Sequence, residues 1–475
     1  MRAAVWALCA LALAACGSKA PPPPPPPPPF ELRSVVAGRL AELPALPEAA
    51  AATDEVREEL RGLVTAAAGE AHMLAVARDD VARLGPGAAA VLAELARDGE
   101  LEQRERAAAV DLLAAAEPHA ALALVALATD AQPAWVRARA AWRLSTEGPD
   151  QVVPALVLLL RYEKDHETVV WIAAALARHA NYAGLDGLLA ISGAQDSPAK
   201  AQADQELGVL VADLGLESAA DLWRAWRSGD PEGRLPHPER SPLYRREVWA
   251  WIDRMREFQL RGVDDARFIL ERLDRDAADA LAEALHEDDL YVRVHVAQSL
   301  QRMGPRGAAA GPELLKALAD PELAPYAAEA LGGVRFAPAL SSLIENSGPR
   351  AAPGLRLAAV RALGFLGEPA ALAPLRALLT EPGAELLQAA AESVVLLDPE
   401  AKDAALLLAG MLEDPRVDPA SSERALRTWL YDRGATAEIE RWDALAAPPN
   451  TVELPETTRG RRAERAALVR AYLGA

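Results

Sequence analysis

The segment Trp135-Val136-Arg137-Ala138-Arg139-Ala140-Ala141-Trp142-Arg143-Leu144 carries the pattern that decides the fold. An anchor residue, here Arg137, is followed by a small or apolar residue three places on and by Leu seven places on. Positions 0, 3 and 7 lie near one face of an α-helix. The pattern therefore predicts a helix that buries this face.

The same pattern recurs eight times, with anchors spaced 31, 32 and 31 residues in a first run and 31, 32 and 32 in a second. The anchors are Arg106, Arg137, Val169, Lys200, Arg293, Ala324, Arg356 and Gln388. A spacing this constant is typical of tandem structural units.

Glycine and proline predict a second helix in each unit. Gly148-Pro149, Gly304-Pro305 and Gly367-Glu368-Pro369 each precede a further apolar run, and these residues end one helix and begin the next. A pair of antiparallel helices in about 31 residues cannot bury its own apolar faces and must stack on its neighbours. We therefore expect an all-α fold, an α-α superhelix of stacked helix pairs.

These segments resemble the HEAT-repeat family, in the short form also called phycobilisome-lyase-like HEAT repeats. The segment quoted above and Asp289-Leu290-Tyr291-Val292-Arg293-Val294-His295-Val296-Ala297-Gln298-Ser299-Leu300 carry the resemblance, which covers residues 71–215 and 263–435. It implies a HEAT-like solenoid and says little about function.

The resemblance also implies that an anchor arginine pairs with an aspartate of the inter-helix turns. On this basis Arg137 would pair with Asp130, and Arg293 with Asp288 or Asp289. We expect the ladder to be interrupted where the anchor is not basic, at Val169, Ala324 and Gln388.

Composition limits the function classes. Of the 475 residues 51% are hydrophobic and 25% are charged, and the formal net charge is −19. Such an acid excess argues against nucleic acid as the partner. We interpret it first as a solvated surface; the alternative is that it attracts a basic partner. The two cysteines exclude a disulfide framework and a four-cysteine zinc site.

The N-terminus resembles a bacterial lipoprotein signal. A short apolar stretch follows Arg2 and ends in Leu13-Ala14-Ala15-Cys16, which is similar to a lipobox. The resemblance implies that residues 1–15 are removed and that Cys16 carries the acyl chains that anchor the protein in the membrane. Gly17 favours the outer membrane of a bacterial cell envelope. An ordinary secretory signal with an incidental cysteine is the alternative.

A polyproline tether follows in residues 16–30. Pro21 to Pro29 is an unbroken run of nine prolines. Proline fixes φ and has no N–H, so the run must be polyproline II and spans roughly 28 Å. We interpret it as a spacer between membrane and body; a docking ligand for a proline-binding groove is the alternative.

The two ends of the body depart from the repeat. Residues 31–70 are expected to be a cap or a degenerate repeat. Residues 436–475 are expected to form a polar loop and a capping helix from Arg461 to Leu473, whose basic cluster docks on the acidic solenoid.

Residues 216–262 interrupt the period and are rich in aromatic and basic residues. They hold six of the chain's 22 aromatic residues, and nine arginines against eight acids. Trp and Arg dominate binding hot spots, so we take this segment as a candidate partner-binding site. The candidate residues are Trp223, Trp226, Arg245, Arg246, Trp249, Trp251 and Arg254. The alternatives are that the tryptophans fill a local core or that two degenerate repeats lie here. Trp249 and Trp251 cannot both point inward on one helix.

No catalytic or metal motif was identified, so we predict no catalytic residue, metal or cofactor. Two His-Glu dyads, His166-Glu167 and His286-Glu287, resemble the iron ligands of HEAT-repeat hydroxylases, which need four dyads within helices. We expect both dyads in inter-helix turns, in different registers. The preferred function is therefore a non-enzymatic, lipid-anchored scaffold that binds a protein or peptide at the cell envelope. The alternative is a HEAT-type enzyme, either lyase-like or iron-dependent.

Overall fold

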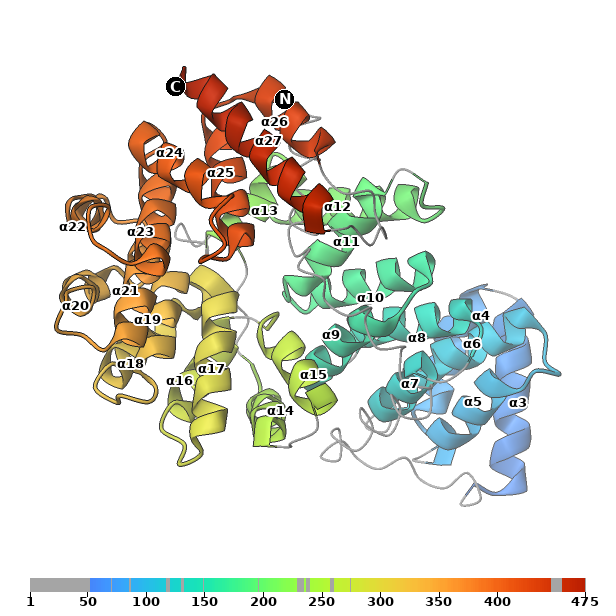
Figure 1. Cartoon of the computed structure of the whole chain (residues 1–475). Coiled ribbons are helices and arrows are strands. Elements are labelled where there is room, and N and C mark those ends of the chain that lie inside the picture. Colours follow the sequence, from blue (N-terminus) through green and yellow to red (C-terminus); the bar gives the residue numbers. More distant parts are fainter. Residues whose placement is uncertain are drawn as a thin grey trace. The chain divides into compact units, whose positions relative to one another are not determined.

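The computed structural model describes residues 52–69, 71–84, 87–116, 120–129, 132–147, 149–194, 196–228, 235, 240–256, 260–273, 275–445 and 455–474. Within these ranges every regular element is an α-helix or a short 3-10 helix, so the predicted all-α fold is confirmed. The predicted signal peptide, Cys16 and the polyproline tether lie outside the described residues. The chain divides into unit 1, residues 1–280, and unit 2, residues 281–475 (Figure 1).

The repeats of unit 1 form two stacked layers of helices. The helices that carry the anchor pattern, here called anchored helices, pack side by side in one layer, and second-layer helices alternate with them along the chain. The anchored helices are α6 (Gln103–Leu113), α8 (Ala134–Glu147), α10 (His166–Arg178) and α12 (Lys200–Asp213). The second-layer helices are α5 (Gly87–Arg97), α7 (Ala120–Thr129), α9 (Val153–Tyr162) and α11 (Ala183–Gly193). Before them, α3 (Asp54–Gly69) and α4 (Ala71–Val81) pack on α6.

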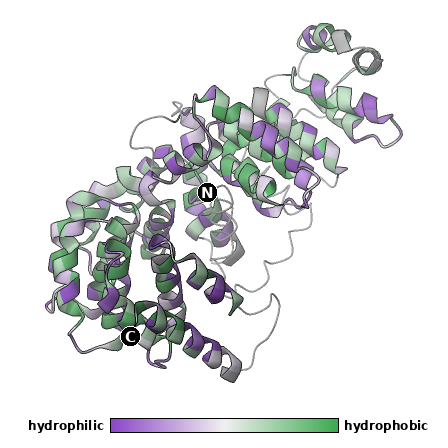
Figure 2. Ribbon diagram, turned by 90° about the horizontal axis from the view of Figure 1, so that it is seen from above, coloured by the Kyte–Doolittle hydropathy of each residue, from purple (hydrophilic) through white to green (hydrophobic). Residues whose placement is uncertain are grey.

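Unit 2 repeats this arrangement, and α16 (Arg275–Ala284) spans the division between the units. The anchored helices are α17 (Leu290–Met303), α19 (Ala324–Gly333), α21 (Pro353–Leu366) and α23 (Ala384–Leu397). The next helix, α25 (Pro419–Asp432), carries none of the eight anchors but packs on α23 in the same layer and is counted with them. The second-layer helices are α18 (Gly311–Ala317), α20 (Leu340–Asn346), α22 (Leu372–Leu378), α24 (Lys402–Met411) and α26 (Thr436–Ala444). Each unit is thus a HEAT-like solenoid, and Figure 2 shows both hydrophobic and hydrophilic residues along the helices.

Burial confirms the anchor pattern. All sixteen residues at the third and seventh places after the eight anchors are at most 4% exposed. They are Ala109, Leu113, Ala140, Leu144, Ile172, Leu176, Ala203, Leu207, Val296, Leu300, Ala327, Leu331, Ala359, Leu363, Ala391 and Val395. Short 3-10 turns lead into the second-layer helices after the Gly-Pro signals, as in η2 (Asp150–Val152), η4 (Gly304–Ala310) and η6 (Pro369–Ala371). The pattern therefore marks the faces that meet in the core.

Small residues bring the anchored helices of unit 2 into backbone contact. A Cβ placed on Gly332 of α19 would lie 2.6 Å from the Cα of Ala362 on α21. A Cβ on Gly364 of α21 would lie 2.7 Å from the Cα of Ser393 on α23. The Ser393 hydroxyl donates to the carbonyl oxygen of Val360, 2.9 Å away. The layer is therefore packed too closely for any side chain at these two glycines.

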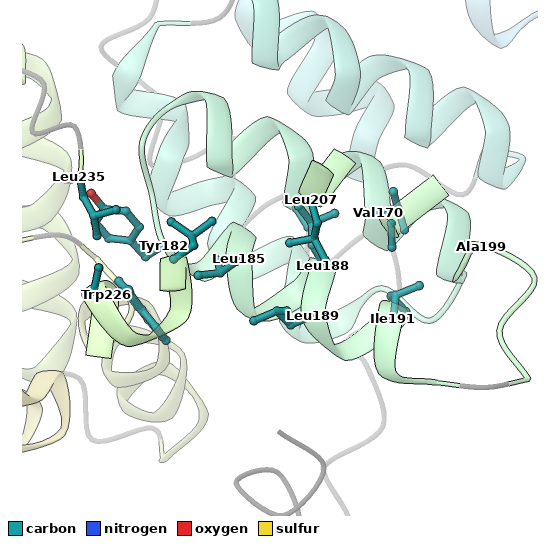
Figure 3. Packing of buried hydrophobic residues seen from close by; sticks show 14 residues of the cluster. Val170, Tyr182, Leu185, Leu188, Leu189, Ile191, Ala199, Leu207, Trp226 and Leu235 are labelled. Atoms are coloured by element: carbon teal, nitrogen blue, oxygen red, sulfur yellow. The ribbon is translucent and has the colours of Figure 1, made fainter. Parts of the chain in front are cut away.

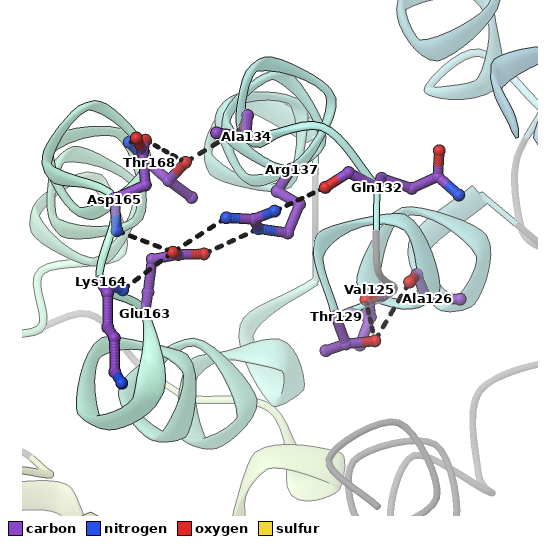
Figure 4. Close-up of polar contacts among 10 residues, drawn as sticks. All are labelled: Val125, Ala126, Thr129, Gln132, Ala134, Arg137, Glu163, Lys164, Asp165 and Thr168. Atoms are coloured by element: carbon purple, nitrogen blue, oxygen red, sulfur yellow. Dashed lines mark hydrogen bonds and ion pairs between the residues drawn. The ribbon is translucent and has the colours of Figure 1, made fainter. Parts of the chain in front are cut away.

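The anchor arginines form a ladder in which each one reaches forward to the next repeat. Arg137 donates two hydrogen bonds to Glu163, 2.8 and 3.0 Å away, and a third to the carbonyl oxygen of Gln132 (Figure 4). Glu163 lies in the turn before the next anchored helix, α10. The arginine therefore joins the turn before its own helix, through Gln132, to the turn before the next anchored helix. The expected partner of Arg137, Asp130, lies outside the described residues.

The other arginines of the ladder show the same forward pairing. Arg293 pairs with Asp320 at 2.5 Å and Arg356 with Glu381 at 2.6 Å. The expectation that Arg293 pairs with Asp288 or Asp289 was wrong, because Asp289 caps α17 and accepts a hydrogen bond from the Tyr291 amide. At the non-basic anchor Gln388 the ladder continues as an amide, which donates to Asp418 O, Ser421 and Ser422.

The segment between the two repeat runs forms helices that fold back on α9. After α13 (Ala219–Arg227) come α14 (Pro242–Asp253), η3 (Arg254–Arg256) and α15 (Leu260–Leu270). Ser241, which caps α14, donates from its amide and hydroxyl to Asp150, each at 2.6 Å. Asp265 of α15 accepts from Tyr162 at 2.5 Å and pairs with Arg161 at 3.0 Å. These helices therefore form a third layer over part of unit 1.

A C-terminal helix, α27 (Pro455–Leu473), packs on α24 and α26 in unit 2. Arg462 and Arg465 each pair with Glu423 at 3.2 Å, and the Arg465 guanidinium lies 5.1 Å from the ring centre of Trp442. Ala466 and Val469 are fully buried. None of the helices within the described ranges has the length and apolar character needed to cross a bilayer.

Candidate functional site: a tryptophan and arginine surface on the anchored helices

The structure places the two predicted tryptophans of α13 in or beside the core of unit 1. Trp226 is 9% exposed and packs in a cluster with Tyr182 and Leu235, its ring centre 6.4 Å from that of Tyr182 (Figure 3). Trp223 is half-buried against the same cluster. The packing around α13 thus agrees with the alternative that these tryptophans fill a local core.

The predicted residues of α14 lie elsewhere, against η2 and α9. Trp251 is 1% exposed, with the Arg254 guanidinium 5.5 Å from its ring centre, whereas Trp249 is half-buried. Arg245 and Arg246 are exposed. The predicted residues of α13 thus lie beside α12, and those of α14 lie beside α9.

A different set of tryptophans and arginines does meet on one surface, which we call the Trp/Arg surface. Trp142 of α8 and Trp171 of α10 pack edge to face, with ring centres 4.9 Å apart at 69°. The Arg178 guanidinium lies 4.3 Å from the Trp142 ring centre and pairs with Glu206 of α12 at 3.0 Å. Each such aromatic or cation–π contact stabilises by about 0.5–1.5 kcal/mol.

A buried carboxylate completes the Trp/Arg surface. Asp111 of α6 is 2% exposed and accepts from Arg139 and Arg143 of α8, at 2.5 and 2.9 Å. Burial alone would raise the pKa of Asp111, but the hydrogen bonds and positive charge of both arginines outweigh it and hold this pKa below its usual range. The carboxylate is therefore ionised at neutral pH and fixes both guanidinium groups.

The Trp/Arg surface thus crosses four consecutive anchored helices, from α6 to α12. Its residues are Asp111, Arg139, Trp142, Arg143, Trp171, Arg178 and Glu206. Both tryptophans are half-buried, and the Arg139 side chain is 43% exposed. Side chains held in this way offer rigid aromatic area and directed donors at a small entropic cost of binding.

The two His-Glu dyads belong to different units. His166 and Glu167 begin α10, not a turn as expected, and the His166 ring is 2.9 Å from the Ser197 hydroxyl. His286 lies in the turn after α16 and its ring is 2.8 Å from Glu313. Among the described residues no group of three or more His, Cys, Asp or Glu is placed to hold a metal ion.

The helix pairs, the stacked anchored layer and the arginine ladder together define a HEAT-repeat α-solenoid. Residues 311–396, which run from α18 to α23, match a family model described as HEAT repeats. No curated protein matches the chain.

Several solved structures are similar to this chain at low identity. Human deoxyhypusine hydroxylase in complex with glycerol is 19% identical, over 65% of this chain and 95% of that one, with a TM-score of 0.22. An engineered protein is 16% identical over 92% of this chain and 99% of that one, with a TM-score of 0.23. Kap121p bound to Pho4p is 12% identical over 89% of this chain and 58% of that one, with a TM-score of 0.30. At these identities the likeness concerns the fold alone.

Proposed function

We propose that the chain is a non-enzymatic scaffold that binds a protein or peptide through the Trp/Arg surface of unit 1. The observation that carries this proposal is the contact of Trp142, Trp171 and Arg178 across two anchored helices. Beside it, the buried Asp111 holds two further arginines in place. Trp and Arg are the residue types that contribute most to binding energy in protein interfaces. A partner with a carboxylate near the exposed edge of Arg139 and apolar groups over the tryptophans fits this chemistry.

We propose that the protein is located at the bacterial cell envelope, where acyl chains on Cys16 anchor it in the membrane. The support is the lipobox-like Leu13-Ala14-Ala15-Cys16 followed by the proline run. Metabolic labelling with a clickable fatty acid tests it: we expect label on the wild-type chain and none on Cys16→Ser. Label that persists in the variant contradicts the lipid anchor.

Crosslinked capture from envelope fractions tests the binding proposal. We expect partners captured by the wild-type chain to be lost with Arg139→Glu, because this charge reversal acts at a half-exposed side chain, and with Trp171→Phe. The matched control is Arg416→Glu, an exposed arginine of unit 2. A captured set that is unchanged in both variants, in chains that melt as the wild type does, refutes the Trp/Arg surface as the binding site.

The competing proposal is an iron-dependent HEAT enzyme built on the two His-Glu dyads. Metal analysis of the purified chain separates the two proposals. If the purified chain holds stoichiometric iron and the His166→Ala/His286→Ala variant loses it, the scaffold proposal is refuted and the enzyme proposal is supported.

A further inference from the structure

A row of exposed apolar side chains runs along the anchored layer of unit 2. Phe365, Leu396 and Tyr431 are 51%, 38% and 38% exposed. Each is the second-last residue of a 14-residue anchored helix, on α21, α23 and α25 respectively. Half of the six large hydrophobic side chains exposed in the described structure thus occupy one repeated position. We call these three residues the apolar strip.

Packing places the members of the apolar strip at regular intervals. The three helices are neighbours in the layer, and Gly364 and Ser393, close to Phe365 and Leu396, are in contact. Packed helices are separated by about 8–10 Å, so the strip offers one apolar group at each such step. A polyproline II helix has three residues per turn and a pitch of about 9 Å, so one of its faces repeats at the same step.

Charges beside the apolar strip balance one another. Glu329, Arg361, Glu392 and Arg424 follow at intervals of 32, 31 and 32 residues on α19, α21, α23 and α25. Arg361 lies 3.7 Å from Glu329, and the Glu392 carboxylate accepts from Ser421 at 2.6 Å. A face with alternating charges favours an uncharged occupant over a strongly charged one.

Hydrogen-bond donors also flank the apolar strip. They suit an occupant whose backbone offers hydrogen-bond acceptors but no donors. Arg424 is exposed and donates to no other described residue, and the Tyr431 hydroxyl lies at the strip itself. A proline run has free carbonyl oxygens and no N–H group, so it needs donors from its receptor. Pre-ordered polyproline II segments bind in this way to apolar and aromatic surfaces.

We propose that the apolar strip is a polyproline-docking surface and that its occupant is the run Pro21–Pro29 of this chain. Nine prolines make three turns, one for each member of the strip. The tether then has an extended form and a docked form. This proposal does not depend on a partner at the Trp/Arg surface.

The test uses the full chain with Pro21–Pro29 replaced by nine Gly and Ser residues, titrated with a fluorescent nonaproline peptide. We expect saturable binding, and about tenfold weaker binding in Phe365→Ala/Tyr431→Ala. Val209→Ala, at an exposed apolar residue of unit 1, is the matched control. Absence of saturable binding, or equal affinity in the double variant, overturns the proposal.

Hydrogen exchange of the unmodified full chain gives a second, independent readout. We expect the last turns of α21, α23 and α25 to exchange more slowly in the wild-type chain than in the chain with the replaced proline run. Equal exchange at these turns in the two chains overturns the assignment of Pro21–Pro29 as occupant. Protection that increases with protein concentration assigns the docked run to a second copy.

Discussion

The substitution Gly364→Ala tests whether backbone contact between anchored helices holds the solenoid of unit 2 together. The new Cβ would lie 2.7 Å from Cα, Cβ and Oγ of Ser393, so α21 and α23 must separate or shift. Overpacking of this kind costs about 1–3 kcal/mol. Disturbing the hydrogen bond from Ser393 to Val360 adds about 1 kcal/mol, and the better helix propensity of Ala offsets about 1 kcal/mol. We expect a net loss of about 1–3 kcal/mol.

Gly354 on the same helix supplies the matched control for this substitution. A Cβ on Gly354 meets nothing within 4 Å, so Gly354→Ala keeps only the gain in propensity. Unit 2 has the size of a domain whose melting temperature moves by about 2–4 °C per kcal/mol. In differential scanning calorimetry Gly364→Ala is therefore expected to melt about 2–12 °C lower and Gly354→Ala no lower than the wild type. A Gly364→Ala chain as stable as the Gly354→Ala chain refutes the reasoning.

Three further predictions concern the polar contacts. Arg137→Met removes the bidentate pair with Glu163 and is expected to cost about 1–3 kcal/mol, seen as a lower melting temperature, while Arg416→Met, on the surface, leaves the melt unchanged. The folded pKa of Asp111 is depressed, so its carboxylate stabilises the fold above its ordinary pKa of about 3.8, and this contribution is lost as pH falls through the folded value. Asp111→Asn should therefore destabilise most at pH 7 and progressively less as the pH falls below about 3.8, and a loss that does not change over this range would contradict this. Arg465→Ala removes a pair and a cation–π contact of α27, so the amides of this helix should exchange faster while those of α21 do not change.

The repeat could be predicted from the sequence because the same burial requirement selects the same residue types in every repeat. A residue at the third or seventh place after an anchor faces both neighbouring helices, so only small or apolar side chains fit, as Ala140 and Leu144 show. The partner of each anchor arginine was not readable in this way. An arginine side chain reaches either turn, and which carboxylate it meets depends on how far one helix pair is displaced from the next. For Arg293, the choice of Asp320 over the earlier Asp289 is set by stacking, which the local sequence does not encode.

The Trp/Arg surface was not predicted from the sequence for a related reason. Counting Trp and Arg in residues 216–262 measures composition, whereas a surface needs side chains from different helices at matching positions. Trp142 and Trp171 lie at the fifth and second places after their anchors, on the face opposite to the buried positions. Placing each tryptophan on its repeat, instead of counting tryptophans per segment, would have indicated this pair.

The sequence of α9 also indicates that a third layer covers this helix. On α9 every residue from Val153 to Leu159 is buried, so this stretch has no exposed face. A helix that is apolar on all sides must be covered on all sides. The polar residues that do occur at its ends, Asp150, Arg161 and Tyr162, are the ones that bind Ser241 and Asp265 of the covering segment. The all-apolar run at α9 and the Trp-rich interruption are thus two parts of one interface, about 100 residues apart in the chain.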